Sequence, residues 1–260
     1  VWRTTPVTTI LVGGTDPADR NLISGNVFGM YMLDSGAVIQ GNLIGTDASG
    51  AAALPNTDTG IVCATFFATG ATIGGSAAGE GNVISGNQDS GVSVGAAGLS
   101  GITGTVIQGN IIGLDVTGNV AIGNTSTGVR TGNAGFVVGG SQPGARNVIS
   151  GTPNGVLFSN SGSTFTSIVQ GNYIGTDIAG TVSRGNGTGV SIGSDTATSI
   201  GGSAPGEGNV ISGNATGIHI FNLDAKAIGG LYNAVVQGNI IGLNAAGTAA
   251  IGNTSHIHIN

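Results

Sequence analysis

The sequence has few charged residues, few aromatic residues and a single cysteine. Charged residues make up 7% of its 260 residues and aromatic residues 4%, whereas charged residues are about a quarter of an average globular domain. Six Lys and Arg stand against twelve Asp and Glu, for a formal net charge of −6. The chain therefore has no basic surface to bind phosphates, and we expect no nucleic-acid partner. Cys63 has no second cysteine to pair with, which excludes an internal disulfide.

Long apolar runs are also missing. No apolar run reaches the ~18 residues of a membrane-spanning helix, so we expect no membrane span. Glycine is abundant instead, with 52 residues, and each glycine disfavours a helix by about 1 kcal/mol relative to alanine. The apolar residues are mainly Val, Ile and Ala in short runs such as NVISG at 82–86. This composition predicts an extended, turn-rich chain with a packed apolar interior.

Two phrases alternate along the chain. The first is a fourteen-residue phrase that reads GGSAAGEGNVISGN and GGSAPGEGNVISGN in its second and fourth copies. Its four copies begin at Gly13, Gly74, Gly139 and Gly201. The second phrase, such as VIQGNIIGLDVTG, is marked by glutamines at Gln40, Gln108, Gln170 and Gln237. We therefore expect one domain, 1–260, made of four tandem repeat units at approximately 1–73, 74–138, 139–200 and 201–260.

Shorter motifs that recur within each unit indicate the coils of a β-solenoid. Strands of the type Gly-Val-x-Val, such as Gly91–Val94, recur in the later units, and the equivalent isoleucines Ile84 and Ile107 are 23 positions apart. A period of this length with glycine and asparagine corners predicts about twelve coils, three to a unit, stacked ~4.8 Å apart over ~58 Å.

The repeated residues have expected structural roles. The isoleucine of NVISGN should point inward and form an aliphatic ladder of Ile23, Ile84, Ile149 and Ile211. Asparagines at the Gly-Asn corners, such as Asn87 and Asn110 on successive coils, should hydrogen-bond along the axis. We interpret these asparagines as turn residues rather than as a binding site.

The units resemble the right-handed parallel β-helix repeat proteins, the pectate-lyase-like superfamily, in their non-catalytic repeat type. The resemblance covers the whole chain and rests on the phrasing NVISGN, GVxI, VIQGNxIG and TIGG. It implies an all-β, right-handed parallel β-helix. It implies no particular activity, because this fold carries lyases, hydrolases, epimerases, adhesins and inert fibres alike.

The acidic residues do not form an obvious catalytic cluster. Asp47, Asp115 and Asp177 lie in equivalent turns, which the predicted coils place ~14 Å apart. Calcium needs oxygen ligands at about 2.3–2.6 Å, so these three cannot share an ion. Asn244 replaces the acid in the last unit, and we interpret all four as polar turn residues. Glu80 and Glu207 lie in equivalent turns separated by two units and are further apart still, and Asp16 and Asp19 are interpreted as solvated turn residues.

Histidine and cysteine offer no stronger site. His256 and His258, spaced as i and i+2 on a strand, could chelate zinc or copper, but no third ligand is near in the sequence. His219 is interpreted as surface decoration, equivalent to Tyr31, Ser93 and Leu157. Cys63 lies in the apolar stretch IVCATFF and should be buried and inert. We expect no catalytic residue, cofactor or metal, and no enzyme activity.

The two ends suggest self-assembly. Seven residues follow Asn253, and thirteen run from Val1 to Gly13, so the end of one copy and the start of the next could complete a shared coil. The predicted interface is Val1, Trp2, Val7, Ile10, Val12, His256, Ile257, His258 and Ile259. Such a head-to-tail contact does not close and generates a filament. The predicted function is a structural subunit of an extracellular β-helix filament or cell-surface fibre, with further copies of itself as partner and surface polysaccharide as a second candidate partner.

Other hypotheses stay open. A carbohydrate-active enzyme, a polysaccharide lyase or epimerase, predicts a groove lined by carboxylates, arginines and aromatics. A glycan-binding adhesin predicts exposed aromatic ladders, which Tyr31, Phe158 and Phe221 do not form consistently. The chain could also be an excerpt of a longer repeat array, because the end of such an excerpt and its start would likewise combine into one coil.

Overall fold

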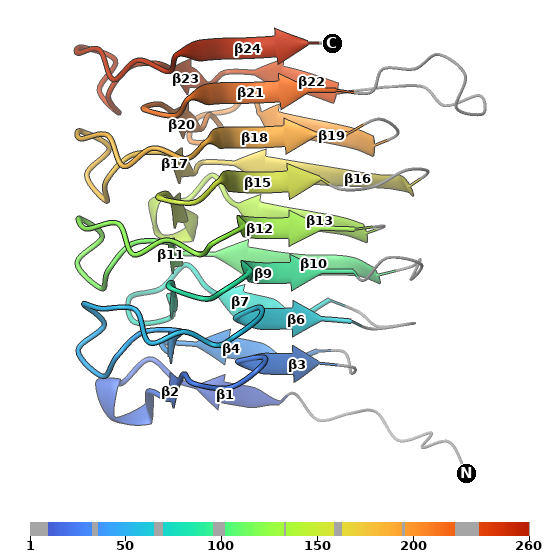
Figure 1. Cartoon of the computed structure of the whole chain (residues 1–260). Coiled ribbons are helices and arrows are strands. Elements are labelled where there is room, and N and C mark those ends of the chain that lie inside the picture. Colours follow the sequence, from blue (N-terminus) through green and yellow to red (C-terminus); the bar gives the residue numbers. More distant parts are fainter. Residues whose placement is uncertain are drawn as a thin grey trace.

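The chain is built almost wholly of short parallel β-strands. The computed structural model describes residues 10–32, 36–64, 70–95, 102–132, 134–158, 163–193, 196–221 and 234–259. Its 24 strands form three parallel sheets of eight strands each. The chain visits the three sheets in a constant order, so that every third strand returns to the same sheet (Figure 1). This arrangement is a parallel β-helix, as the sequence predicts.

The strands are assigned to sheets A, B and C in the order in which the chain meets them. Sheet A holds β1 (Leu11–Gly13), β4 (Val38–Gln40), β7 (Thr72–Gly74), β10 (Ile102–Gln108), β13 (Ala134–Gly139), β16 (Ser163–Gln170), β19 (Thr196–Gly201) and β22 (Ala234–Gln237). Sheet B holds β2 (Leu22–Ile23), β5 (Leu43–Ile44), β8 (Val83–Ile84), β11 (Ile111–Ile112), β14 (Val148–Ile149), β17 (Tyr173–Ile174), β20 (Val210–Ile211) and β23 (Ile240–Ile241). Sheet C holds β3 (Met30–Met32), β6 (Ile61–Cys63), β9 (Ser90–Val94), β12 (Thr127–Thr131), β15 (Asn154–Phe158), β18 (Thr188–Ile192), β21 (Thr216–Ile220) and β24 (Ser255–Ile259). Two 3-10 turns, η1 (Pro17–Asp19) and η2 (Pro143–Ala145), lie between sheets A and B.

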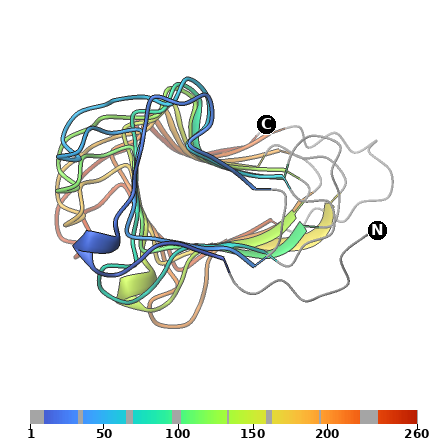
Figure 2. The same cartoon turned by 90° about the horizontal axis from the view of Figure 1, so that it is seen from below.

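The coil is right-handed. Figure 2 looks along the axis with the N-terminal end nearest, and the chain runs clockwise from sheet A through sheet B to sheet C as it recedes. This hand agrees with the right-handed twist that parallel crossovers follow.

The described residues form eight coils, two to each repeat unit, so the predicted number of twelve is wrong. Twelve coils would require Ile84 and Ile107 to be equivalent, but Ile84 lies in sheet B and Ile107 in sheet A. The phrase VIQGNIIG contains two strands, because the chain turns at Gly109–Asn110 between β10 and β11. Eight coils at ~4.8 Å rise about 38 Å instead of ~58 Å.

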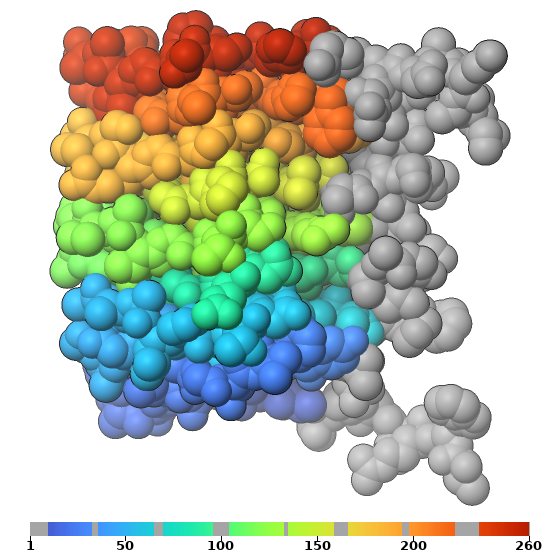
Figure 3. Space-filling view, viewed as in Figure 1, coloured from blue at the N-terminus to red at the C-terminus, as the bar shows by residue number. Residues whose placement is uncertain are grey.

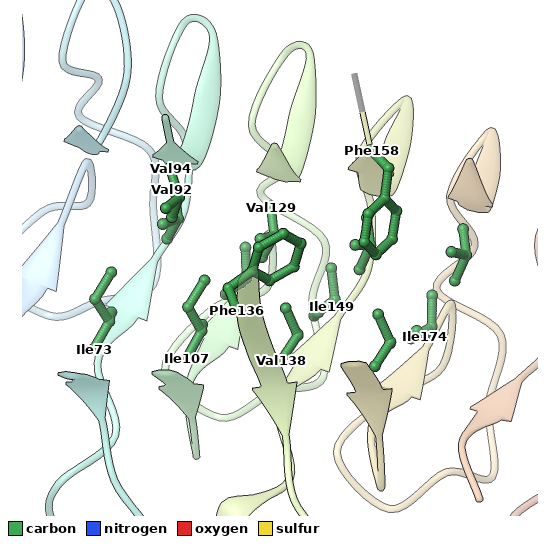
Figure 4. Packing of buried hydrophobic residues seen from close by; sticks show 14 of the residues in the cluster. Ile73, Val92, Val94, Ile107, Val129, Phe136, Val138, Ile149, Phe158 and Ile174 are labelled. Carbon is green, nitrogen blue, oxygen red and sulfur yellow. The ribbon is translucent and has the colours of Figure 1, made fainter. Parts of the chain in front are cut away.

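The predicted inward isoleucine ladder is confirmed. Strand pairing in sheet B places in one row Ile23, Ile44, Ile84, Ile112, Ile149, Ile174, Ile211 and Ile241. The six inner members are fully buried, while the two in the first and last coils are half-buried. Rows from sheets A and C, such as Ile73 to Val138 and Val92 to Val156, close the core around them (Figure 4). The apolar interior is therefore a stack of like residues, one layer per coil.

One asparagine ladder follows the corner between sheets A and B. Its members are Asn21, Asn42, Asn82, Asn110, Asn147, Asn172, Asn209 and Asn239. Each backbone N–H and side-chain amide donates to the Oδ1 of the asparagine one coil further on, at 2.9–3.2 Å. Backbone groups that leave the sheet at the corner are satisfied in this way.

A second ladder follows the corner between sheets B and C. Its members are Asn26, Asn56, Asn87, Asn124, Thr152, Asn186, Asn214 and Asn253. The bonds run from Asn26 to Asn124 and again from Thr152 to Asn253, and they point in the same direction. Hydrogen bonding of stacked asparagines along the axis is confirmed. Asn87 and Asn110, however, belong to different ladders, because a coil has two asparagine corners.

Longer loops project from alternate coils. The odd-numbered coils carry glycine loops between sheets A and B at 13–20, 74–81, 139–146 and 201–208. The even-numbered coils carry ridge loops between sheets B and C at 46–53, 114–121, 176–183 and 243–250, each closed by an antiparallel bridge. The ridge loops touch one another across the intervening coil, as in the 2.9 Å bond from the Ile178 N–H to the Gly118 carbonyl. This alternation explains why the sequence repeats every two coils.

Candidate functional site

The acidic residues of the ridge loops cap their own turns. In each loop, the side-chain oxygen of Asp47, Asp115, Asp177 or Asn244 accepts the N–H groups of the residues four and five positions further on. The prediction that these are polar turn residues is confirmed. They recur every two coils, or ~9.6 Å, rather than ~14 Å.

The carboxylate of Asp115 makes one turn sensitive to acid. Burial raises the pKa of Asp115, but bonds from the Val120 and Asn119 N–H groups and from Thr117 outweigh it, and the pKa lies below its ordinary value of 3.8. A lowered folded pKa means that the carboxylate stabilises the fold above the ordinary pKa. This contribution is lost as the pH falls through the folded pKa.

We predict that Asp115→Asn removes part of this acid sensitivity. An amide oxygen accepts the same two bonds, as Asn244 does, so the variant should stay within about 1 kcal/mol of the wild type near neutral pH. Between about pH 7 and about pH 3, its free energy of unfolding should fall less than that of the wild type. Urea unfolding at both pH values measures this, and an equal fall in both proteins would contradict it.

Among the described residues, the other acids do not form a cluster, whereas His219 and His258 lie side by side on the outer face of sheet C, with 5.1 Å between ring centroids. Asp16 and Asp19 are exposed, whereas Glu80 and Glu207 are half-buried and accept the N–H of the residue three positions before, at 2.8 Å. Across the described ranges, no three His, Cys, Asp or Glu side chains lie close enough together to hold a metal ion. The outward placement of His219 in the row of Ser93 and Leu157 is confirmed by the strand register.

Cys63 is buried, as predicted. Its side chain is 3% exposed, and burial raises the pKa of the thiol to about 12. We predict that a thiol reagent modifies Cys63 in the folded protein at least about 100-fold more slowly than in denaturant, because the thiolate is the reacting species. The control is Cys63→Ser with Ser93→Cys, which moves the thiol to the outer face of sheet C. Equal reaction rates for both folded proteins would contradict the prediction.

The predicted interface residues lie at opposite ends of the stack. Val1, Trp2 and Val7 fall outside the described residues. Ile10 and Val12 belong to the first coil, where Ile10 is 46% exposed and Val12 packs against the core. His256, Ile257, His258 and Ile259 belong to β24 in the last coil. Figure 3 shows these two coils as the lower and upper faces of the molecule.

Each terminal coil already has one strand in every sheet. The first coil consists of β1, β2 and β3, and the last of β22, β23 and β24. A head-to-tail contact between two copies would therefore join whole coils, rather than complete the shared coil that the sequence predicts. At the last coil the side chains of Ile257 and Ile259 are 46% and 62% exposed, and within the described residues the outermost strands of both terminal coils have an unpaired edge.

The two asparagine ladders end in complementary groups, which the sequence analysis missed. At the first coil, within the described residues, the Oδ1 atoms of Asn21 and Asn26 accept no hydrogen bond. At the last coil, the backbone N–H groups of Asn239 and Asn253 have no acceptor there, although the Oδ1 of each accepts from the coil before. One end thus offers acceptors and the other offers donors, at the same two corners.

A depression marks the place beyond the last glycine loop. It measures about 630 Å³ and is lined by residues 202–206, Gly208, Gln237, Gly238 and Ile240. Inside the stack, two glycine loops flank the equivalent corner: a Cβ on Gly109 would lie 2.1 Å from the Gly75 oxygen and 2.9 Å from the Gly144 oxygen. Gly238 has such a neighbour on one side alone, the Gly202 oxygen at 2.0 Å. The depression is where a further glycine loop would fit.

The residues that the structure describes thus form a parallel β-helix whose first and last coils each have an open strand edge. No protein-family model, no curated protein and no solved structure matches the chain. The described residues contain no helix of the length and apolarity that crossing a membrane requires.

Proposed function

We propose that the chain is a structural subunit of an extracellular β-helix filament or surface fibre, with copies joined head to tail through their terminal coils. In this contact β22, β23 and β24 of one copy lie beside β1, β2 and β3 of the next. The contact joins two different surfaces and does not close, so it produces a filament.

The complementary ends of the asparagine ladders are the observation on which this proposal rests. The N–H groups of Asn239 and Asn253 would donate to the Oδ1 atoms of Asn21 and Asn26 in the next copy, repeating the bonds between inner coils. The three sheets would continue by strand addition, which replaces an exposed edge by main-chain hydrogen bonds.

The alternation of loops supports the same contact. The last coil carries a ridge loop and the first a glycine loop, so the order of loops would continue across the joint. Glycine loops also alternate in type: Arg20 and Arg146 donate to the carbonyls of Gly41 and Gly171 in the first and third units. The second and fourth units have Glu80 and Glu207 in this loop. The first unit following the fourth would preserve this alternation.

Placement outside the cell and membership of the non-catalytic repeat type of the pectate-lyase-like superfamily belong to this proposal. Stacked aliphatic side chains and amide ladders hold the interior together, and Cys63 is the sole cysteine, so the proposed fibre would keep its form outside the cell without a disulfide. Surface polysaccharide remains a second candidate partner.

The test compares two lysine substitutions at isoleucines of equal exposure. Ile257 lies on the C-terminal face at 46% exposure, and Ile178 lies on a ridge loop at 45%. Wild-type protein examined by sedimentation and negative-stain electron microscopy up to about 1 mM should form unbranched rods. Their lengths should be multiples of ~38 Å.

Ile257→Lys should prevent assembly, because it places a charge in the buried part of the joint, whereas Ile178→Lys should assemble as the wild type does. Monomers at every wild-type concentration would overturn the proposal, as would equal assembly of the two variants.

A further inference from the structure

Seven coils have glycine where the chain enters sheet C. These residues are Gly29, Gly60, Gly91, Gly128, Gly155, Gly189 and Gly217. A Cβ at any of them would lie 2.5–2.8 Å from a backbone carbonyl oxygen of the next coil. Glycine is required there because the covering coil approaches so closely.

His256 stands at this position in the eighth coil. The neighbouring pair Ile218 and Ile257 fixes the register, and a Cβ on Gly217 would lie 2.5 Å from the His256 oxygen. The imidazole of His256 lies against Gly242, with Cε1 at 3.1 Å from the point where a Cβ on that glycine would stand. Beside the equivalent glycines Gly45, Gly113 and Gly175, this place is taken by the carbonyl oxygens of Ser85, Ser150 and Ser212. The side chain of His256 therefore occupies space that a further coil would need.

Ala18 is the corresponding residue at the other end. In the later glycine loops its place is taken by Gly79, Gly144 and Gly206. A Cβ on these glycines would lie 2.4, 1.9 and 2.1 Å from the carbonyl oxygens of Thr15, Ser76 and Ser141, in the loop two coils earlier. Among the described residues no loop lies beneath the first glycine loop, which carries the methyl group of Ala18.

We infer that His256 and Ala18 weaken the head-to-tail joint, so that two copies bind less tightly than neighbouring coils of one chain. This inference rests on the contact proposed above. In the internal register, the Gly29 carbonyl of the next copy would approach the Cβ of His256, and the Ser203 carbonyl would approach the next copy's Ala18. For the ends to join, the imidazole must leave Gly242 and the first glycine loop must shift. A filament of such copies separates at its joints while each set of eight coils stays folded.

The experiment restores glycine at both ends. The double variant Ala18→Gly with His256→Gly is compared with the wild type and with a control double variant, Ala78→Gly with His219→Gly. Ala78 is an exposed alanine of an inner glycine loop, and His219 lies in β21, one coil inside the joint, in the outward row of Ser93 and Leu157. Sedimentation velocity over a concentration series gives the dissociation constant of end-to-end association. The glycine variant should associate about tenfold more tightly than the wild type or more, because overpacking of this kind is costly to accommodate.

Each outcome decides the inference. Equal association of the wild type and the glycine variant overturns the inference and leaves the head-to-tail contact standing. If neither protein associates up to about 1 mM, both the inference and the proposed function fall. A gain of the same size in the control variant also overturns the inference, because glycine flexibility alone would explain it. Adding Ile257→Lys to the glycine variant should abolish the gain, and a persisting gain would place the contact elsewhere and overturn the inference.

Discussion

Asn147→Ala should lower the free energy of unfolding by about 4 kcal/mol, because it leaves several buried polar groups without partners. The Asn147 side chain is fully buried in the middle of the first ladder. Its Oδ1 accepts the backbone N–H and the amide of Asn110, both at 3.0 Å. Its Nδ2 donates to the Ile107 carbonyl at 2.8 Å and to the Oδ1 of Asn172 at 2.9 Å. Alanine removes all four bonds, and the packed corner leaves little room for water to replace them.

The matched control is Asn239→Ala, at the last member of the same ladder. Asn239 is half-buried: its Oδ1 accepts the N–H and the amide of Asn209, and its Nδ2 donates to the carbonyls of Ile200 and Gln237. Water can reach the groups that this change exposes, so we expect a loss of about 1–2 kcal/mol. Urea unfolding followed by circular dichroism measures both variants, and equal losses would show that position along the ladder has no effect.

Ile149→Ala should cost about 2–5 kcal/mol, the range for truncating a buried aliphatic side chain to alanine. Ile149 is fully buried and lies between Ile112 and Ile174 in the sheet B row. Coils held in register by the asparagine corners on both sides cannot collapse into the space that is left, which puts the loss in the upper part of that range.

Ile241→Ala is the control for this truncation. Ile241 is the last isoleucine of the row, and it is half-buried because no described coil covers it. Its truncation should cost less than half as much, because part of its surface already faces water. Hydrogen exchange should show faster opening throughout the stack for Ile149→Ala and near β23 alone for Ile241→Ala. A larger loss for Ile241→Ala would contradict the layered core.

The fold could be predicted from the sequence because its repeat units share short sequence motifs that recur at a regular spacing. NVISGN places an apolar residue between two corner residues, and this pattern is enough to predict both the parallel coils and the inward side of Ile84. The coil count could not be obtained in this way. Strands of sheets A and B have similar sequences, so Ile84 and Ile107 resemble equivalent residues of successive coils. They belong to two different sheets, sheet B and sheet A.

The ends could be predicted only in part. Ile10, Val12 and the four residues from His256 to Ile259 do lie at the two terminal coils. The absence of a glycine at His256 is visible in the sequence, since Gly217 precedes Ile218 where His256 precedes Ile257. Its meaning depends on how closely a neighbouring carbonyl approaches that position, a distance through space between residues far apart in the chain. The donors and acceptors without partners at the ladder ends likewise depend on the direction of the hydrogen bonds between stacked asparagines, which the sequence does not specify.

The common direction of the asparagine bonds also gives the molecule an electrical polarity. Amide groups that donate one after another along two corners align their dipoles, and aligned hydrogen bonds reinforce each other. The first coil therefore has a partial negative potential at its free Oδ1 atoms, and the last coil a partial positive one at its free N–H groups. Two rods lying side by side would be attracted in antiparallel orientation, and an applied field would align them along their length.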